Sequence, residues 1–196
     1  MRLPLMTLSR PTLPSVVLKP SMRRVAVFGN AGGGKSTLAR QLAAITGLPL
    51  YAVDKLQWQD GGAAVPHDVY LNLHRDLLAK EVWIIDGYGD TATVLERCSV
   101  ADTLIHVDLP LAIHYWWVTK RLIMGLFADP AGWPKGSPLW SSTMSGYRVI
   151  PQCHKYLTPR YRQLISEMAT SKFVVHLRSP REIRAFLDNV RSELTH

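Results

Sequence analysis

The sequence predicts an α/β protein with a five-stranded parallel sheet covered by helices on both faces. Strand patterns and helix patterns alternate along the chain, and this alternation favours parallel strands linked by covering helices. The length of 196 residues suits one domain with a sizeable core. A glycine-rich loop follows the first strand pattern and opens a helix pattern. The predicted strands span residues 25–28, 50–53, 82–85, 103–107 and 173–177.

The helix patterns fit between these strands. They cover residues 35–46, about 68–79, about 93–99, 110 to about 127, about 159–169, and a last helix from about 180. Gly47 is placed to end the first helix. In the last helix Ser179 and Glu182 have the spacing of a capping box, with Glu182 reaching back to the N–H of the cap residue.

Two segments depart from this rhythm. Residues 1–22 contain four prolines and no acidic residue, which predicts a disordered tail before a domain at 23–196, with Met22 as a candidate true start. Residues 129–151 are rich in proline and glycine. A loop of this length usually carries function, so we expect a mobile basic lid at about 125–158.

The net charge of +8 is unevenly distributed. Residues 1–24 carry five basic residues and no acid, and residues 109–162 carry seven basic residues and one acid. A basic segment beside an anionic ligand explains this better than a continuous nucleic-acid-binding stripe, which makes nucleic acid an improbable partner. The two cysteines lack metal-site or redox spacing, and the apolar stretch 109–127 is interrupted by charged residues, so we expect a soluble, cytoplasmic protein.

The glycine-rich loop fits the phosphate-binding pattern G-x-x-x-x-G-K-[ST]. Its residues are Gly29, Asn30, Ala31, Gly32, Gly33, Gly34, Lys35, Ser36 and Thr37. Backbone N–H groups at the start of a helix can cradle the phosphates of a nucleotide, with Lys35 at the β- and γ-phosphates and the Ser36 hydroxyl on Mg²⁺.

Three aspartates follow strand patterns and so belong at the carboxyl edge of the sheet, where ligands bind in α/β folds. Asp54 and Asp86 are candidates for holding Mg²⁺ or accepting a proton from an acceptor hydroxyl. Asp108 comes shortly before Pro110, and the favoured interpretation for it is a helix cap. No histidine pair has the spacing of a helical zinc motif, so zinc is not expected.

Several strings resemble the adenylate-kinase-related P-loop proteins known as topology modulation proteins. They are the glycine-rich loop, Val53-Asp-Lys-Leu-Gln-Trp58, Trp83-Ile-Ile-Asp-Gly87, Ala101-Asp-Thr-Leu-Ile-His-Val-Asp-Leu-Pro110 and Leu177-Arg-Ser-Pro-Arg-Glu182. The resemblance covers about residues 23–190. It implies a P-loop NTPase three-layer sandwich of the nucleoside monophosphate kinase type.

The resemblance also implies roles for single residues. Asp86 would be the Mg²⁺-associated acid and Asp54 would face the phosphoryl acceptor. Arg121 would be a lid arginine on the phosphates, and Arg97 would lie on the acceptor side. The turn before Ser179 would pass the adenine. Trp58 is a further candidate for lining the acceptor pocket.

Two positions depart from the family pattern. Tyr88-Gly89 stands where Asn-Tyr is usual, and Trp117 stands one helical turn before Arg121, where another arginine is expected. A missing cation would weaken phosphoryl transfer, whereas an indole could stack on a base or an apolar acceptor.

The sequence thus predicts an ATP- and Mg²⁺-dependent kinase that transfers the γ-phosphate to a small-molecule or nucleotide acceptor. The alternative is a P-loop ATPase or a nucleotide-dependent regulatory protein without such an acceptor, and a nucleic-acid-binding protein comes third. A monomer and a homodimer are both compatible with the sequence.

Overall fold

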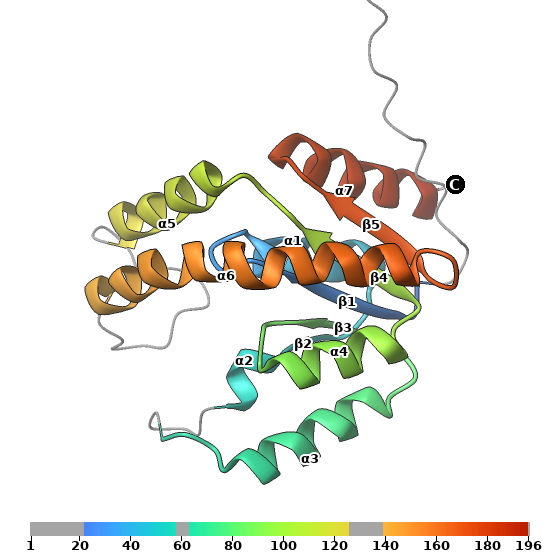
Figure 1. Cartoon of the computed structure of the whole chain (residues 1–196). Helices are drawn as coiled ribbons and strands as arrows, with labels where there is room; N and C mark the ends of the chain where they lie inside the picture. The colour runs from blue at the N-terminus through green and yellow to red at the C-terminus, as the bar shows by residue number, and fades with distance from the viewer. Residues whose placement is uncertain (1–21, 58–62, 126–138, 196) are drawn as a thin grey trace, which may run out of the picture.

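The predicted parallel sheet is present. The computed structural model describes residues 22–57, 63–125 and 139–195. Its five strands pair in parallel in the order β2-β3-β1-β4-β5, with β1 in the middle (Figure 1). The strands are β1 (Arg24–Gly29), β2 (Leu50–Ala52), β3 (Trp83–Asp86), β4 (Thr103–Val107) and β5 (Phe173–Leu177).

Helices cover the sheet on both faces, which makes a three-layer α/β sandwich (Figure 1). They are α1 (Lys35–Thr46), α2 (Val53–Leu56), α3 (His67–Leu78), α4 (Thr91–Val100), α5 (Leu111–Gly125), α6 (Leu139–Met168) and α7 (Pro180–Leu194). One core cluster joins the sheet to α1 and α7, and the other joins it to α3, α4 and α6. The predicted fold class is therefore confirmed.

The central strand shows how the sequence builds both clusters. Val25 and Val27 of β1 pack toward α1 and α7, whereas Ala26 and Phe28 belong to the opposite cluster. All four are almost completely buried. A parallel strand that is covered on both faces has a continuous run of apolar residues, and this pattern predicted β1.

Helix α6 corrects part of the predicted loop at residues 129–151. It runs for 30 residues and includes Pro151 and Pro159, so the part of the predicted loop from 139 onward is helical. Packing stabilises this helix despite its prolines. The Tyr147 ring stacks on Tyr115 of α5 at a centroid distance of 5.6 Å, and the Tyr147 hydroxyl hydrogen-bonds to Thr119. Residues 126–138 of the predicted lid, the predicted tail 1–21 and Trp58 lie outside the described residues.

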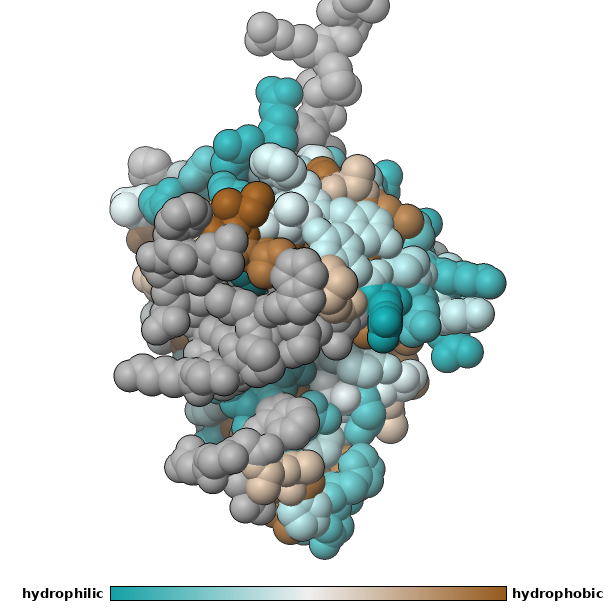
Figure 2. Space-filling view, turned by 90° about the vertical axis from the view of Figure 1, so that its left-hand side faces the viewer, coloured by the Kyte–Doolittle hydropathy of each residue, from teal (hydrophilic) through white to brown (hydrophobic). Residues whose placement is uncertain are grey.

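Helix α5 carries exposed apolar side chains, namely Trp116, Ile123 and Met124. Figure 2 views the end of the molecule where α5 and α6 meet, and it shows hydrophilic surface beside apolar atoms.

Among the described helices, none combines the length and the apolar character that crossing a membrane requires.

The helix ends follow the sequence signals with one change. Gly47 ends α1 in the left-handed region with φ of 72°, and its N–H donates to Ala43 O. Ser179 caps α7 by accepting from the N–H of Glu182 at 3.2 Å. The Glu182 carboxylate accepts from the N–H of Arg178, at 2.7 Å. The prediction that the Glu182 carboxylate binds the N–H of the cap residue Ser179 is wrong by one residue. The carboxylate binds the N–H of the preceding residue, Arg178, instead.

Candidate active site

The glycine-rich loop joins the end of β1 to the start of α1. Gly34 is the N-cap of α1 with φ of 72°, α1 has no side-chain cap, and its first turn contains no acidic residue. The Lys35 ammonium donates to Asn30 O at 2.9 Å, across the loop. An uncapped helix N-terminus with a lysine beside it is a favourable place for an anion.

One face of α5 packs on this loop. His114, Trp117 and Val118 lie on that face, next to the positions that Cβ atoms on Gly33, Gly34 and Gly32 would occupy. The His114 Nδ1 atom lies 2.8 Å from Ala31 O, and its Nε2 atom lies 3.1 Å from Leu109 O. The imidazole therefore bridges the loop and the start of α5. Burial lowers the pKa of this imidazole.

Helix α6 contacts the same loop from the other side. The Asn30 side-chain amide donates to Ile150 O at 3.1 Å, and Asn30 is 3% exposed. The Cys153 thiol lies against Ala31. Burial raises the pKa of this thiol, and the Ala31 N–H and the Lys35 charge oppose this rise without cancelling it. The loop is held between α5 and α6.

Two arginines lie near the start of α1. Arg40 donates from Nε to Ser36 O at 3.1 Å. Arg121 lies on α5, one turn after Trp117, and partial burial together with the charge of Arg40 lowers its pKa. Arg121 was among the residues predicted from the sequence, whereas Arg40 was not. The sequence signal that could have indicated Arg40 is its position in α1. It lies four residues, or about one helical turn, after Ser36, and residues at this spacing are neighbours on a helix surface.

The acidic residues lie at the carboxyl ends of β2 and β3. Asp86, the last residue of β3, is 3% exposed, and its Oδ1 atom has no hydrogen-bond partner among the described residues. Ala52 pairs with Asp86 in the sheet register, which brings Asp54 beside the loop that follows β3. The Asp54 Oδ1 atom accepts from the N–H groups of Tyr88 and Gly89, at 2.9 and 3.4 Å.

Gly87 allows this close approach. Its φ of +108° lies in the region that favours glycine, and a Cβ atom there would lie 3.0 Å from the Asp54 carboxylate carbon. A side chain at residue 87 would thus displace Asp54 and strain the backbone.

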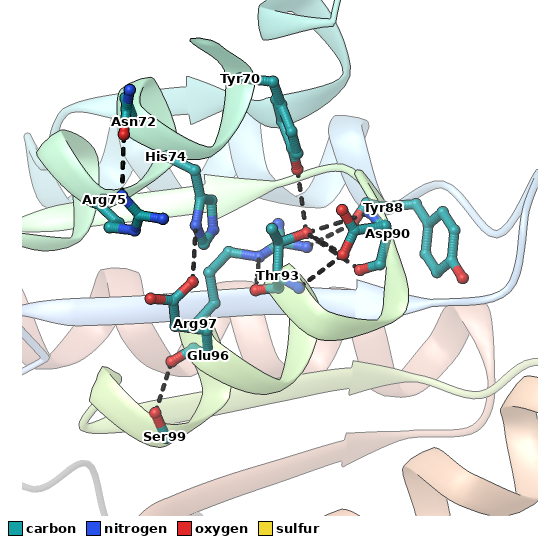
Figure 3. A network of polar contacts seen from close by, with 10 residues as sticks. All are labelled: Tyr70, Asn72, His74, Arg75, Tyr88, Asp90, Thr93, Glu96, Arg97 and Ser99. Atoms are coloured by element: carbon teal, nitrogen blue, oxygen red, sulfur yellow. Dashed lines mark hydrogen bonds and ion pairs between the residues drawn. The ribbon is translucent and has the colours of Figure 1, made fainter. Parts of the chain in front are cut away.

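Arg97 lies beneath this loop and is 2% exposed (Figure 3). Its guanidinium donates to the carbonyls of Gly87 at 2.9 Å, Tyr88 at 2.7 Å and Thr93 at 3.2 Å. Arg97 is the residue predicted to lie on the acceptor side, and its donors are directed at backbone oxygens in a buried position. Sequence spacing gave no signal of this burial.

The residues around Arg97 form a polar network between α3 and α4 (Figure 3). The Tyr70 hydroxyl hydrogen-bonds to Thr93 Oγ1 at 3.0 Å, and Asp90 caps α4 by accepting from the Thr93 N–H at 2.8 Å. Burial is the main cause that raises the pKa of Tyr70. This network fixes the chain that follows β3.

Asp108 does not act as a helix cap. Its carboxylate accepts from Arg162 Nε at 2.7 Å, from Arg162 Nη2 at 3.0 Å and from His176 Nε2 at 2.8 Å. The prediction of a cap is therefore wrong. The partners come from α6 and β5, which are far away in the sequence, so the local spacing before Pro110 was misleading.

Comparison with known proteins supports the fold. No family model matches the chain, and no curated protein matches it. Among solved structures, a shikimate kinase from Acinetobacter baumannii in complex with shikimate is 14% identical with a TM-score of 0.56, and the match covers 89% of this chain and 94% of that one. An unliganded sugar kinase from Janibacter sp. HTCC2649 is 16% identical with a TM-score of 0.45, covering 89% and 92%. The likeness to the shikimate kinase is therefore one of fold, an α/β fold with a five-stranded parallel sheet.

Proposed function

We propose that this chain is an ATP-dependent kinase that transfers the γ-phosphate of Mg-ATP to a small-molecule or nucleotide acceptor. The observation that carries the proposal is the placement of Asp54 and Asp86 at the carboxyl ends of β2 and β3, with Lys35 at the open N-terminus of α1, which follows the neighbouring strand β1. Phosphoryl transfer needs phosphate binding, a metal-associated acid and an acid at the acceptor, and these three residues supply them.

In this proposal the backbone of residues 29–37 and Lys35 hold the phosphates. Arg121, with Arg40 beside it, balances charge on the transferred group, and the turn at Arg178 and Ser179 borders the adenine. Removing one preorganised donor from a transition-state charge typically lowers turnover by about 10²–10³.

Asp86 and Ser36 are the residues that would hold Mg²⁺. The fit rests on the buried Asp86 oxygen, which has no hydrogen-bond partner within the described part of the chain, and on the Ser36 hydroxyl in the first turn of α1. Mg²⁺ prefers oxygen ligands and is usually held through one or two protein groups. When bound, Mg²⁺ neutralises the charge that develops on the phosphates.

The acceptor would lie near Asp54, between α2 and the loop 87–89. Asp54 would accept the proton of the acceptor hydroxyl, and Trp58, which lies outside the described residues, stays a proposed lining residue. Arg97 would act as a positioning residue, because it fixes the carbonyls of Gly87 and Tyr88. The shikimate in the similar kinase makes a hydroxylated small molecule a suitable class to test first.

The competing function is ATP hydrolysis or nucleotide-dependent regulation without an acceptor. It is favoured by Trp117, which packs on Gly34 at the position where the resembling family would place a second arginine. Fewer cations at the phosphates would slow transfer.

The test is a transfer assay with Mg-ATP against nucleoside monophosphates, nucleosides, shikimate, gluconate and related hydroxylated metabolites, scored by phosphorylated product. Lys35→Ala should abolish product formation, whereas Lys80→Ala, an exposed lysine after α3, should not change it. Unchanged turnover in Lys35→Ala would remove the loop from the mechanism.

A further inference from the structure

A cluster of metal-ligating side chains lies at the carboxyl ends of β4 and β5, next to the turn at Arg178 that is proposed to border the adenine. His106 of β4, Asp108 just after β4 and His176 of β5 offer ligand atoms that all lie within 4.8 Å of one another. His106 pairs directly with His176 in the parallel register. Side chains two residues apart on a strand share a face, so His106 and Asp108 point to the same side of the sheet.

His106 is the unusual member of this cluster. It is fully buried, and neither ring nitrogen has a hydrogen-bond partner among the described residues. Its ring stacks between Phe28 and His176, at centroid distances of 5.3 and 5.0 Å. Buried polar groups without partners are rare and call for an explanation.

Asp108 and His176 supply the other ligands. The Asp108 carboxylate accepts hydrogen bonds from Arg162 Nε at 2.7 Å, from Arg162 Nη2 at 3.0 Å and from His176 Nε2 at 2.8 Å. The His176 Nδ1 atom accepts from Arg178 Nε at 3.4 Å, which leaves its proton on Nε2, facing Asp108. An ion that takes Nε2 would release this proton to solvent.

Two members of the cluster, Asp108 and His176, line a surface depression beside the edge strand β5, whereas His106 is fully buried and does not line it. A depression of about 550 Å³ is lined by Asp108, Arg162, Ile165, Ser166, Ala169, Val174, His176 and Arg178. It gives an ion an entry path and leaves room for a water molecule as a further ligand.

Arg162 is the competitor for this site. It binds both oxygens of Asp108, and its side chain is 54% exposed on α6. A cation bound at Asp108 would displace the guanidinium toward solvent, so ion binding and the Arg162 ion pair should oppose each other.

We propose that His106, Asp108 and His176 form a binding site for a divalent transition-metal ion of the zinc class, with a fourth coordination position open to the depression. Two imidazoles and one carboxylate are ligands that Zn²⁺ accepts in tetrahedral sites, whereas Mg²⁺ and Ca²⁺ prefer oxygen ligands alone. Zinc was not expected from the sequence, because a zinc motif within one helix needs closely spaced histidines, and these ligands come from two strands and the residue just after one of them.

The experiment measures Zn²⁺ affinity of the full chain, without a polyhistidine tag, by competition with a chelating dye, and repeats it with Co²⁺ to read the coordination from visible absorption. We expect Co²⁺ bands of a four-coordinate site. His106→Phe should weaken Zn²⁺ binding at least tenfold, since phenylalanine keeps the ring stack and loses the ligand. Arg162→Gln should strengthen it several-fold. His67→Ala, which changes an exposed histidine on α3, is the control and should have no effect.

Equal Zn²⁺ affinity in wild type and His106→Phe would overturn the proposal, because the ion would then be bound elsewhere. An unchanged affinity in Arg162→Gln would also contradict it. Should His106→Phe fail to fold, His176→Gln on the edge strand provides the same test of a lost ligand. None of these readouts depends on nucleotide binding or phosphoryl transfer.

Discussion

The Trp117 ring lies directly against Gly34: its Cζ3 atom is 2.5 Å from the point that a Cβ atom on Gly34 would occupy. Gly34 is also the N-cap of α1, with φ of 72°. The start of the helix that would bind phosphate is thus in contact with α5, and any change in this contact should affect the loop and α5 together.

Gly34→Ala should weaken nucleotide binding at least tenfold, because a methyl group would meet the Trp117 ring. Gly47→Ala is a matched control, since Gly47 has the same φ of 72° but nothing within 4 Å of its Cβ position. Both variants should lose about 1 kcal/mol or more in free energy of unfolding from left-handed strain. Calorimetric titration with ATP and urea unfolding separate the two effects. Equal nucleotide affinity in both variants would contradict the contact argument.

Arg121→Ala should lower turnover more than it weakens ground-state ATP binding, because a charge that acts on the transferred phosphate contributes most in the transition state. We expect a loss of about 10² in kcat. Lys120→Ala removes the neighbouring charge from an exposed position of the same helix and should leave kcat unchanged. Steady-state kinetics and ATP titration measure both quantities. Losses of the same size in turnover and in binding would mean that Arg121 only binds ATP.

Most of the fold could be predicted because its signals are local. The strands 103–107 and 173–177 and the helix 35–46 ended by Gly47 have the predicted bounds. The start of α6 could not be predicted, because Pro151 and Gly146 are local signals for a loop. The contacts that stabilise the helix, such as Tyr147 on Tyr115, join residues far apart in the sequence.

The same distinction holds in the candidate site. The glycine-rich loop and Asp86 follow strand patterns directly, so local order was enough to place them. The burial of Arg97 could not be predicted, because it depends on how the chain after β3 folds over the side chain. The cap prediction for Asp108 was wrong because its partners, Arg162 and His176, are far away in the sequence.

The buried His74 should make the protein less stable in mild acid. Burial is the main cause that lowers its pKa, helped by the Arg97 charge and opposed by Glu96, which lies 3.2 Å away. Below about pH 6.5 the unfolded chain takes up a proton that the folded chain does not, so the free energy of unfolding falls as the pH decreases.

His74→Gln should therefore lose less stability than wild type between pH 7.5 and pH 5, measured as the shift of the urea midpoint. His67→Gln, on the exposed side of α3, should behave like wild type. The other buried histidines add the same slope to all three proteins. An identical pH dependence for His74→Gln and wild type would show that His74 does not titrate as argued.

The most direct test of a kinase function compares Asp54→Asn and Asp86→Asn in the transfer assay, using an acceptor that wild type phosphorylates. Asp54→Asn should suppress product formation while ATP binding stays nearly intact, because Asp54 would act on the acceptor hydroxyl. Asp86→Asn should weaken Mg²⁺-dependent ATP binding as well, because a metal-associated acid serves both steps. If wild type instead releases ADP at one slow rate whatever acceptor is present, and Asp54→Asn releases it at the same rate, the kinase function is contradicted and ATP hydrolysis or regulation takes its place.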